Sequence, residues 1–299
     1  MQLTARPPSR PIRQNERPIQ RPGRLAYLMS AALAAVAAAA TGLTVTFPSV
    51  ITGVAGANGN LRGTAVVVLA VGVPVLAAAL VATSRGSTRA FVIWLGTLAY
   101  LLYQAVMLCF ATPFNSYFLF YVAYLGLAVW AIVFLVRGTD LAAFGLTLSP
   151  RLPIRSIAGF ALVLVVLNAA AWLSGIVPAV LSDNPRAFLT ETGLLTNPVY
   201  IQDLAIWLPL LSTAAVAAWL HRVWGQLVTA AMLVMFVLES ISISVDQYFG
   251  SRADPTLSSM TMVPVFAAVA VVTAVPLIVC LRNIRRSSLT MDLQGDQPR

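Results

Sequence analysis

Two acidic residues lie inside long apolar stretches of this sequence, and a carboxyl group at membrane depth is costly enough to mark a candidate functional site. Fourteen uncharged residues, 225 to 238, precede Glu239. As a helix they span about 21 Å, which is short of a hydrocarbon core of about 30 Å. We therefore predict that Glu239 lies within the bilayer. Its helix face also carries Met232, Met235, Ser242 and Asp246.

The second acid is Asp203, in the stretch NPVYIQDLAIWLP from residue 197 to residue 209. Asn197 and Pro198 are typical of a helix start, which puts Asp203 beyond the first turn. Two interpretations stay open for it. The seventeen uncharged residues 204 to 220 are enough for a minimal span that leaves Asp203 at the outer headgroup boundary. Alternatively, Asp203 faces Glu239, and the two carboxyls titrate as a coupled pair.

Three further polar residues are expected at a similar depth. Gln104 lies in the third apolar stretch, Tyr121 in the fourth and Asn168 near the middle of the fifth. Together with Asp203 and Glu239 they form a predicted outward-facing polar layer that binds a ligand or an ion. The alternative is that these groups only hydrogen-bond between helices, at about 0.6 to 2 kcal/mol for each bond.

Composition places the chain in a bilayer and removes several chemistries. Hydrophobic residues make up 59% and charged residues 10%, against about 45–50% and 25% in soluble proteins. All basic residues are arginine, so a lysine Schiff base or a P-loop lysine is excluded, and the only histidine is His221. Zinc-protease, Cys-x-x-Cys and nucleophile–histidine signatures are missing too. We expect no cofactor, no metal site and no enzymatic activity.

The elements that carry these residues are eight apolar stretches of about the length needed to cross a membrane. The sequence therefore predicts an all-α, polytopic transmembrane bundle. A disordered basic cytoplasmic tail (1–24) precedes the helical domain (25–286), and a polar C-terminal tail (287–299) follows. An alternative for the first stretch is a cleaved signal peptide. The predicted spans are 25–46, 64–83, 90–111, 116–136, 157–177, 199–220, 226–245 and 262–281.

The arginines indicate the orientation of the bundle. With the N-terminal tail inside, sixteen of the nineteen arginines fall on the cytoplasmic side, and only Arg62, Arg186 and Arg252 fall outside. This asymmetry predicts that both termini are cytoplasmic. The basic charge therefore reflects topology and a tail that lies against anionic lipid headgroups, and not binding to nucleic acid.

The predicted outer loop 47–63 holds Gly53, Gly56, Gly59 and Gly63, which we interpret as a flexible turn. Pro74, Pro209 and Pro276 fall inside spans and are expected to kink them. The sequence shows no convincing internal repeat, although eight spans can hide an inverted pair of four.

The stretches from residue 99 to 136 and from 193 to 228 resemble a recurring group of uncharacterised bacterial polytopic membrane proteins. The most specific element is the pattern Asn-Pro-Val-Tyr-x-x-Asp-Leu at residues 197–204. The matching positions are Asn197, Pro198, Asp203, Pro209, Trp224 and Gly225. The resemblance implies a multi-pass protein of the bacterial plasma (inner) membrane, and it implies no activity.

Two functions remain as expectations. In the first, the chain binds or transports a small solute or ion through the outward-facing polar layer. In the second, it is a structural or assembly subunit of the membrane with no ligand, and the polar layer only specifies how the helices pack.

Overall fold

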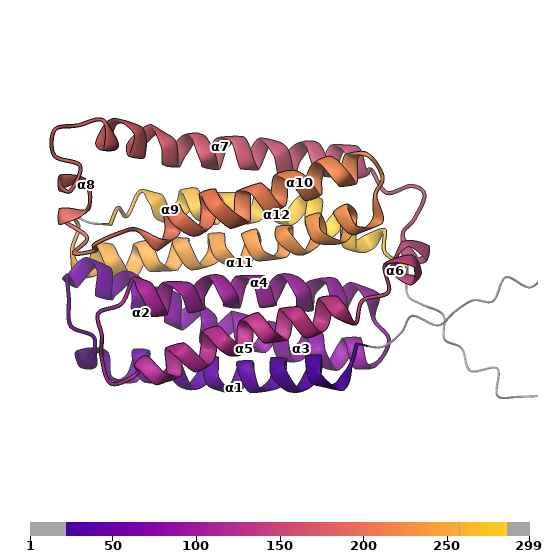
Figure 1. Cartoon of the computed structure of the whole chain (residues 1–299), viewed down its shortest axis with the longest axis horizontal. Helices are drawn as coiled ribbons and strands as arrows, with labels where there is room; N and C mark the ends of the chain where they lie inside the picture. The colour runs from indigo at the N-terminus through magenta and orange to yellow at the C-terminus, as the bar shows by residue number, and fades with distance from the viewer. Residues whose placement is uncertain (1–21, 257, 286–299) are drawn as a thin grey trace, which may run out of the picture.

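The computed structural model describes residues 22–256 and 258–285, and this part of the chain is all-α apart from one isolated β-bridge between Leu148 and Ile284. Eight of its helices are long and apolar enough to cross a membrane, which confirms the predicted polytopic bundle (Figure 1). The tail predicted for 287–299, and almost all of that predicted for 1–24, lie outside the described residues. The spans are α1 (Arg24–Thr46), α2–η2–α3 (Ala55–Ser84), α4 (Thr88–Phe110), α5 (Phe118–Arg137), α7 (Ile154–Val180), α9–η3–α10 (Pro198–Trp219), α11 (Val223–Ala253) and α12 (Met262–Arg282).

Two of the spans are interrupted by a π-helical turn. In the second span, η2 (Val68–Gly72) separates α2 (Ala55–Val67) from α3 (Val73–Ser84). In the sixth, η3 (Asp203–Trp207) separates α9 (Pro198–Gln202) from α10 (Leu208–Trp219). Each π turn is followed by a proline, Pro74 or Pro209, at the second position of the next helix. Since proline has no N–H, the helix cannot keep its regular hydrogen bonds there, and the wider π turn accommodates the break.

The glycines of the predicted outer loop 47–63 correct one interpretation. Gly56, Gly59 and Gly63 are not in a flexible turn, because they are buried on the first turns of α2. A Cβ atom added to Gly59 would stand 2.7 Å from the carbonyl oxygen of Phe249, and one added to Gly63 would stand 2.6 Å from the Cα of Asp246. Glycine is therefore needed for α2 to pack against the backbone of α11. Gly53 alone lies before the helix, with a positive φ of 148°.

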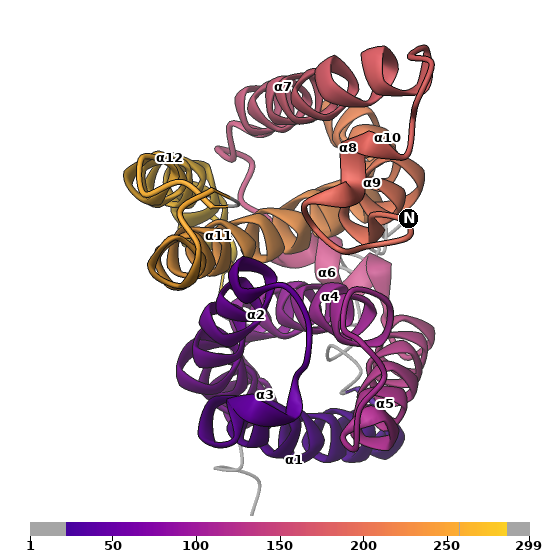
Figure 2. The same ribbon diagram turned by 90° about the vertical axis from the view of Figure 1, so that its left-hand side faces the viewer.

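The eight spans form two groups of four, seen end-on in Figure 2. The first group, α1 to α5, closes on itself, since α1 packs against α5. In the second group, α7 packs mainly against α10, α10 against α11, and α11 against α12. Helix α11 joins the groups because it packs against α2 and α4 as well as α10 and α12.

Helices α1 and α12 have their terminal ends on the same side of the bundle, beside the short helix α6 (Leu141–Thr147) (Figure 1). Here the Arg89 Nε donates a hydrogen bond of 2.9 Å to the carbonyl oxygen of Ile284, which ties the start of α4 to the residues after α12. The opposite side carries η1 (Pro48–Val50), α8 (Ala187–Thr190) and the end of α11. We call these sides the terminal end and the far end.

Candidate functional site

The centre of the candidate site is a contact between α4 and α11. The Gln104 Nε2 donates a hydrogen bond of 2.5 Å to the Glu239 Oε2. Two turns earlier, Gly96 lets the helices approach closely, since a Cβ at that position would stand 2.3 Å from the carbonyl oxygen of Ala231. Gln104 is buried, whereas Glu239 keeps part of its surface accessible. The structure thus brings into direct contact two residues, on α4 and α11, that were expected at a similar depth.

Two tyrosines of α4 extend this contact. Tyr100 lies one turn before Gln104 and Tyr103 directly before it, and both are fully or almost fully buried. The Tyr100 hydroxyl shares a hydrogen bond of 2.6 Å with the Ser242 Oγ, on the face of α11 that also carries Glu239. Tyr103 lies within electrostatic range of both Glu239 and Asp203. These tyrosines were missed by sequence reasoning, although Tyr100 lies four residues before Gln104 and therefore on the same helix face.

Asp203 is the first residue of the π turn η3, and only 7% of its surface is exposed. The Trp172 Nε1, from α7, donates a hydrogen bond of 2.8 Å to the Asp203 Oδ2. Asp203 also lies within electrostatic range of Glu239. Of the two interpretations of Asp203, the structure therefore favours a side chain that faces protein and the neighbouring acid over one at a headgroup boundary. Trp172 packs in turn against Tyr200, with ring centroids 5.0 Å apart.

The other two predicted members of the polar layer are placed differently. Tyr121 is buried on α5, where its neighbours are Thr44 of α1 and Asn115, so it belongs to the interior of the first group and not to the Glu239 contact. Asn168 lies on α7, one turn before Trp172 and on the same face. Its Oδ1 atom is buried and has no hydrogen-bond partner among the described residues. Of the predicted layer, the structure brings Gln104, Asp203 and Glu239 near one another, and it places Tyr121 apart from them and Asn168 one turn before Trp172 on α7.

A second unpartnered atom lies beside Asp203. Gln202 is 2% exposed, and its Oε1 accepts a hydrogen bond of 3.1 Å from the Trp207 Nε1. Its Nε2 is buried and finds no acceptor within the described part of the chain. Buried polar groups in proteins are almost always hydrogen-bonded to protein, water or a ligand. The donor of Gln202, which precedes Asp203 in the sequence, and the acceptor of Asn168, one turn before Trp172, therefore leave hydrogen-bonding capacity unused within the described residues.

Polar side chains follow Glu239 along α11 toward the far end. They are Ser242, Asp246 and Gln247, and we call them the polar trail. Ser242 is followed by Asp246, whose Oδ1 accepts a hydrogen bond of 3.3 Å from the Gln247 Nε2. The Gln247 Oε1 accepts in turn from the backbone N–H of Ser259, at 3.2 Å on the exposed surface. In the other direction, the same helix face carries the buried Met235 and Met232. The polar side chains on this helix face thus extend from Glu239 toward the far end and not toward the terminal end.

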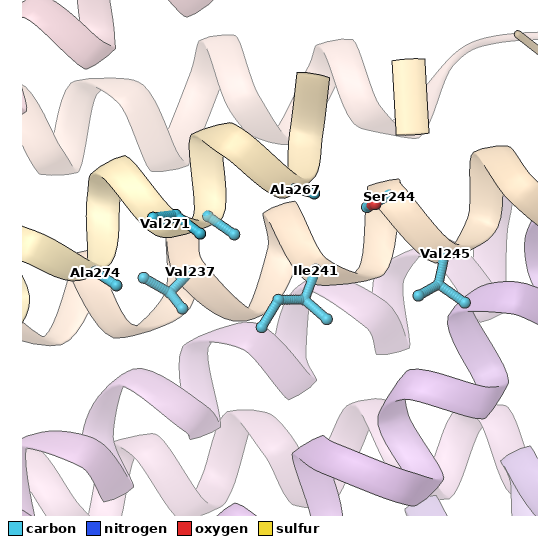
Figure 3. Close-up of a pocket in the computed structure, with 8 residues that line it drawn as sticks. Val237, Ile241, Ser244, Val245, Ala267, Val271 and Ala274 are labelled. Atoms are coloured by element: carbon cyan, nitrogen blue, oxygen red, sulfur yellow. The ribbon is translucent and has the colours of Figure 1, made fainter. Parts of the chain in front are cut away.

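An apolar groove between α11 and α12 lies apart from these groups (Figure 3). Its α11 side is formed by Val237, Ile241, Ser244 and Val245, which are about half a helical turn away from Glu239 and Ser242. The single polar side chain, Ser244, donates its hydroxyl to the carbonyl oxygen of Val263 at 2.8 Å. The groove therefore presents hydrocarbon alone and suits the acyl chain of a surrounding lipid.

Comparison of the chain with protein-family models, with curated proteins and with solved structures finds no match.

Proposed function

We propose that this chain is a proton-linked membrane transport protein in which Glu239 takes up and releases the proton. The observation that carries the proposal is the hydrogen bond from Gln104 to Glu239 inside a membrane span. No arginine of the described residues forms an ion pair with Glu239, so its charge is not balanced by a fixed cation. In such surroundings the protonated carboxyl is neutral, whereas burying the charged carboxylate costs free energy. This difference suits reversible proton binding.

Three features support a site that is open to a ligand and is more than a packing contact. Glu239 keeps accessible surface, although it lies in the middle of a span. Buried polar atoms of Gln202 and Asn168 have no partner among the described residues. The polar trail through Ser242, Asp246 and Gln247 provides a route for protons from the far end. These two atoms offer a donor and an acceptor to a small solute.

The arginines support the orientation of this route. Arg85, Arg89, Arg137, Arg151, Arg155 and Arg222 all lie at the terminal end, between or beside the helix ends that meet there (Figure 1). By the positive-inside rule this end is cytoplasmic, and the polar trail then opens to the outside. The bacterial plasma membrane, indicated by the sequence resemblance, is the location we propose.

Replacement of Glu239 by glutamine tests the proposal. Gln keeps the shape and can still accept the hydrogen bond from Gln104, but it cannot carry a proton. The purified protein is placed in liposomes that contain a pH-sensitive dye, and proton uptake is driven by a potassium diffusion potential. We expect wild-type uptake well above that of empty liposomes and at least a tenfold loss in E239Q.

The matched control is Glu191→Gln, because Glu191 lies exposed beyond α8 and the chemical change is the same. E191Q should keep wild-type uptake. If E239Q transports protons as fast as E191Q and wild type, Glu239 is not the coupling group and the proposal fails.

A structural or assembly role is the second candidate, and the surface of α7 favours it. This helix exposes large apolar side chains along most of its length, among them Val163, Val166 and Leu167. A transmembrane helix of another subunit could pack there. Such a role predicts that E239Q lowers the melting temperature in detergent, that wild-type liposomes show no uptake above background, and that the native protein migrates with a second polypeptide.

A further inference from the structure

Two stretches of the chain share the same helix boundaries at a constant separation of 135 residues. The π turn η2 begins at Val68 and η3 at Asp203, which are 135 residues apart. The same separation holds for the beginnings and ends of α3 (Val73–Ser84) and α10 (Leu208–Trp219). It also holds for Thr88 and Val223, where α4 and α11 begin. An unrelated pair of helical segments would not keep one register across a π turn, two helices and the connection between them.

The connection between the helices repeats in atomic detail. Gly86 has a φ of 86°, and its counterpart His221 has a φ of 58°, the single positive φ of a non-glycine residue in the described chain. The backbone N–H of the next residue closes both turns. Ser87 donates to the carbonyl of Ala82 at 3.0 Å, and Arg222 donates to the carbonyl of Ala217 at 2.8 Å. A left-handed conformation costs a non-glycine residue about 1 to 2 kcal/mol. His221 adopts it because the turn requires it.

Few side chains match between the two stretches, and this explains why the sequence shows no convincing repeat. Pro74 and Pro209 do match, and they mark the end of each π turn. Each half of the chain contains four spans. Because four is an even number, both halves enter and leave the membrane on the same side and have the same orientation. The repeat is therefore parallel, with its axis along the membrane normal, and not the inverted pair that the span count left open.

The same register connects Gln104 with Glu239, which are also 135 residues apart. These two equivalent residues are hydrogen-bonded to each other. When two positions related by a twofold rotation touch, the rotation axis passes between them. The polar contact at the centre of the candidate site is thus the contact between equivalent positions of the two halves.

We propose that the chain is a tandem repeat of a four-span unit and that Gln104 and Glu239 form an exchangeable pair on its axis. Gln104 is the positioning residue, and the carboxyl can be carried by either half. This inference rests on the proposed function only where proton uptake is measured. The titratable groups that face the pair are Tyr100 and Tyr103 from α4, Asp203 from η3 and Asp246 from α11. They stay in place when the two side chains are exchanged.

The two halves are not packed alike around this pair. On one side, Gly59 and Gly63 bring α2 into backbone contact with α11. The positions 135 residues later are Leu194, before α9, and Pro198, its first residue. The short helix α9 therefore cannot approach α4 in the same way. On this side Asp203, which accepts a hydrogen bond from Trp172, lies within electrostatic range of Tyr103 and Glu239.

The test is the exchange variant Gln104→Glu/Glu239→Gln, compared with Glu239→Gln alone. The full-length protein in liposomes is treated over a range of pH with dicyclohexylcarbodiimide, an apolar reagent for protonated carboxyls in membranes. Peptide mass spectrometry then shows where the label is attached. We expect label at residue 239 in wild type, none at either position in E239Q, and label at position 104 in the exchange variant, with a similar pH midpoint. Proton uptake should recover to at least half the wild-type rate.

Two results overturn the inference. The first is an exchange variant that fails to fold while E239Q folds, because exchangeable positions must accept either side chain. The second is a folded exchange variant without label at position 104. As a second variant, Gln104→Leu removes the hydrogen bond and should shift the pH midpoint of labelling at Glu239, whereas an unchanged midpoint contradicts the positioning role. Label that moves with the carboxyl while uptake is absent in all proteins supports the repeat and rejects the proposed transport function.

Discussion

At the scale of single residues, the candidate site depends on the contact between Gln104 and Glu239 and on the hydrogen bond from Trp172 to Asp203. The depth of Glu239 could be predicted by counting, because the fourteen helical residues before it are too few to cross a hydrocarbon core of about 30 Å. Its partner Gln104 was found in the same way. The contact of Trp172 with Asp203 could not be predicted, because it depends on how α7 lies against η3. Tyr121 was assigned by depth alone, and depth does not tell which neighbour a helix face meets.

Trp172→Phe tests the hydrogen bond to Asp203. The substitution keeps an aromatic ring and removes the N–H donor, so a mostly buried carboxylate loses a partner. We expect a loss of about 1 kcal/mol in the free energy of unfolding, measured by denaturant titration in detergent micelles. Trp130→Phe is the control, because Trp130 is exposed on α5. The assignment is contradicted if W172F and Asp203→Asn have fully additive effects in a double-mutant cycle.

At the scale of helices, the lengths of apolar stretches predicted the number and order of the spans. The predicted ends of the spans were less accurate, and the physical reason differs between α2 and α11. Helix α2 begins at Ala55, nine residues before the predicted span, because glycines that favour turns also favour close helix contacts. Helix α11 continues to Ala253 past Asp246 and Gln247, because these polar residues pack against α2 and the loop before α12 and do not end the helix.

Gly63→Ala tests the close contact of α2 with α11. The added methyl group would overlap the backbone at Asp246, so one helix must move. We expect the melting temperature in detergent to fall, at a cost of about 1 to 3 kcal/mol. Gly42→Ala in α1 is the matched control, since no atom lies within 4 Å of its new Cβ. That variant should be neutral or slightly more stable, because alanine favours a helix. Equal melting temperatures of both variants would exclude the close contact.

At the scale of the whole molecule, the all-α bundle follows from composition, but the grouping of its helices does not. Eight apolar stretches permit many arrangements, and hydropathy is the same for a buried and a lipid-facing span. Which helix is central depends on small residues such as Gly96 and Gly225, where helix backbones meet. The orientation in the membrane is a matter of charge, and it is open to a direct experiment.

The predicted topology can be tested by single cysteines in a protein with Cys109 and Cys280 replaced by alanine. Ser182→Cys lies exposed at the far end, and Arg151→Cys lies exposed at the terminal end. In intact cells, a membrane-impermeant maleimide should label only S182C, because we propose that the arginine-rich end faces the cytoplasm. In opened membranes both should react. Labelling of R151C but not S182C in intact cells would reverse the orientation and the direction of the polar trail.

The position of α11 at the junction of the two groups has a consequence for biosynthesis. This helix is the seventh span to leave the ribosome, yet the glycine face of α2 and the amide of Gln104 both pack against it. During translation, the glycine face of α2 and the amide of Gln104 are therefore uncovered until α11 has entered the membrane. Domains of growing chains usually fold in order from the N-terminus. Here the first group is completed only when the second is nearly synthesised, so a chain that stops before residue 253 should be a substrate for membrane quality control.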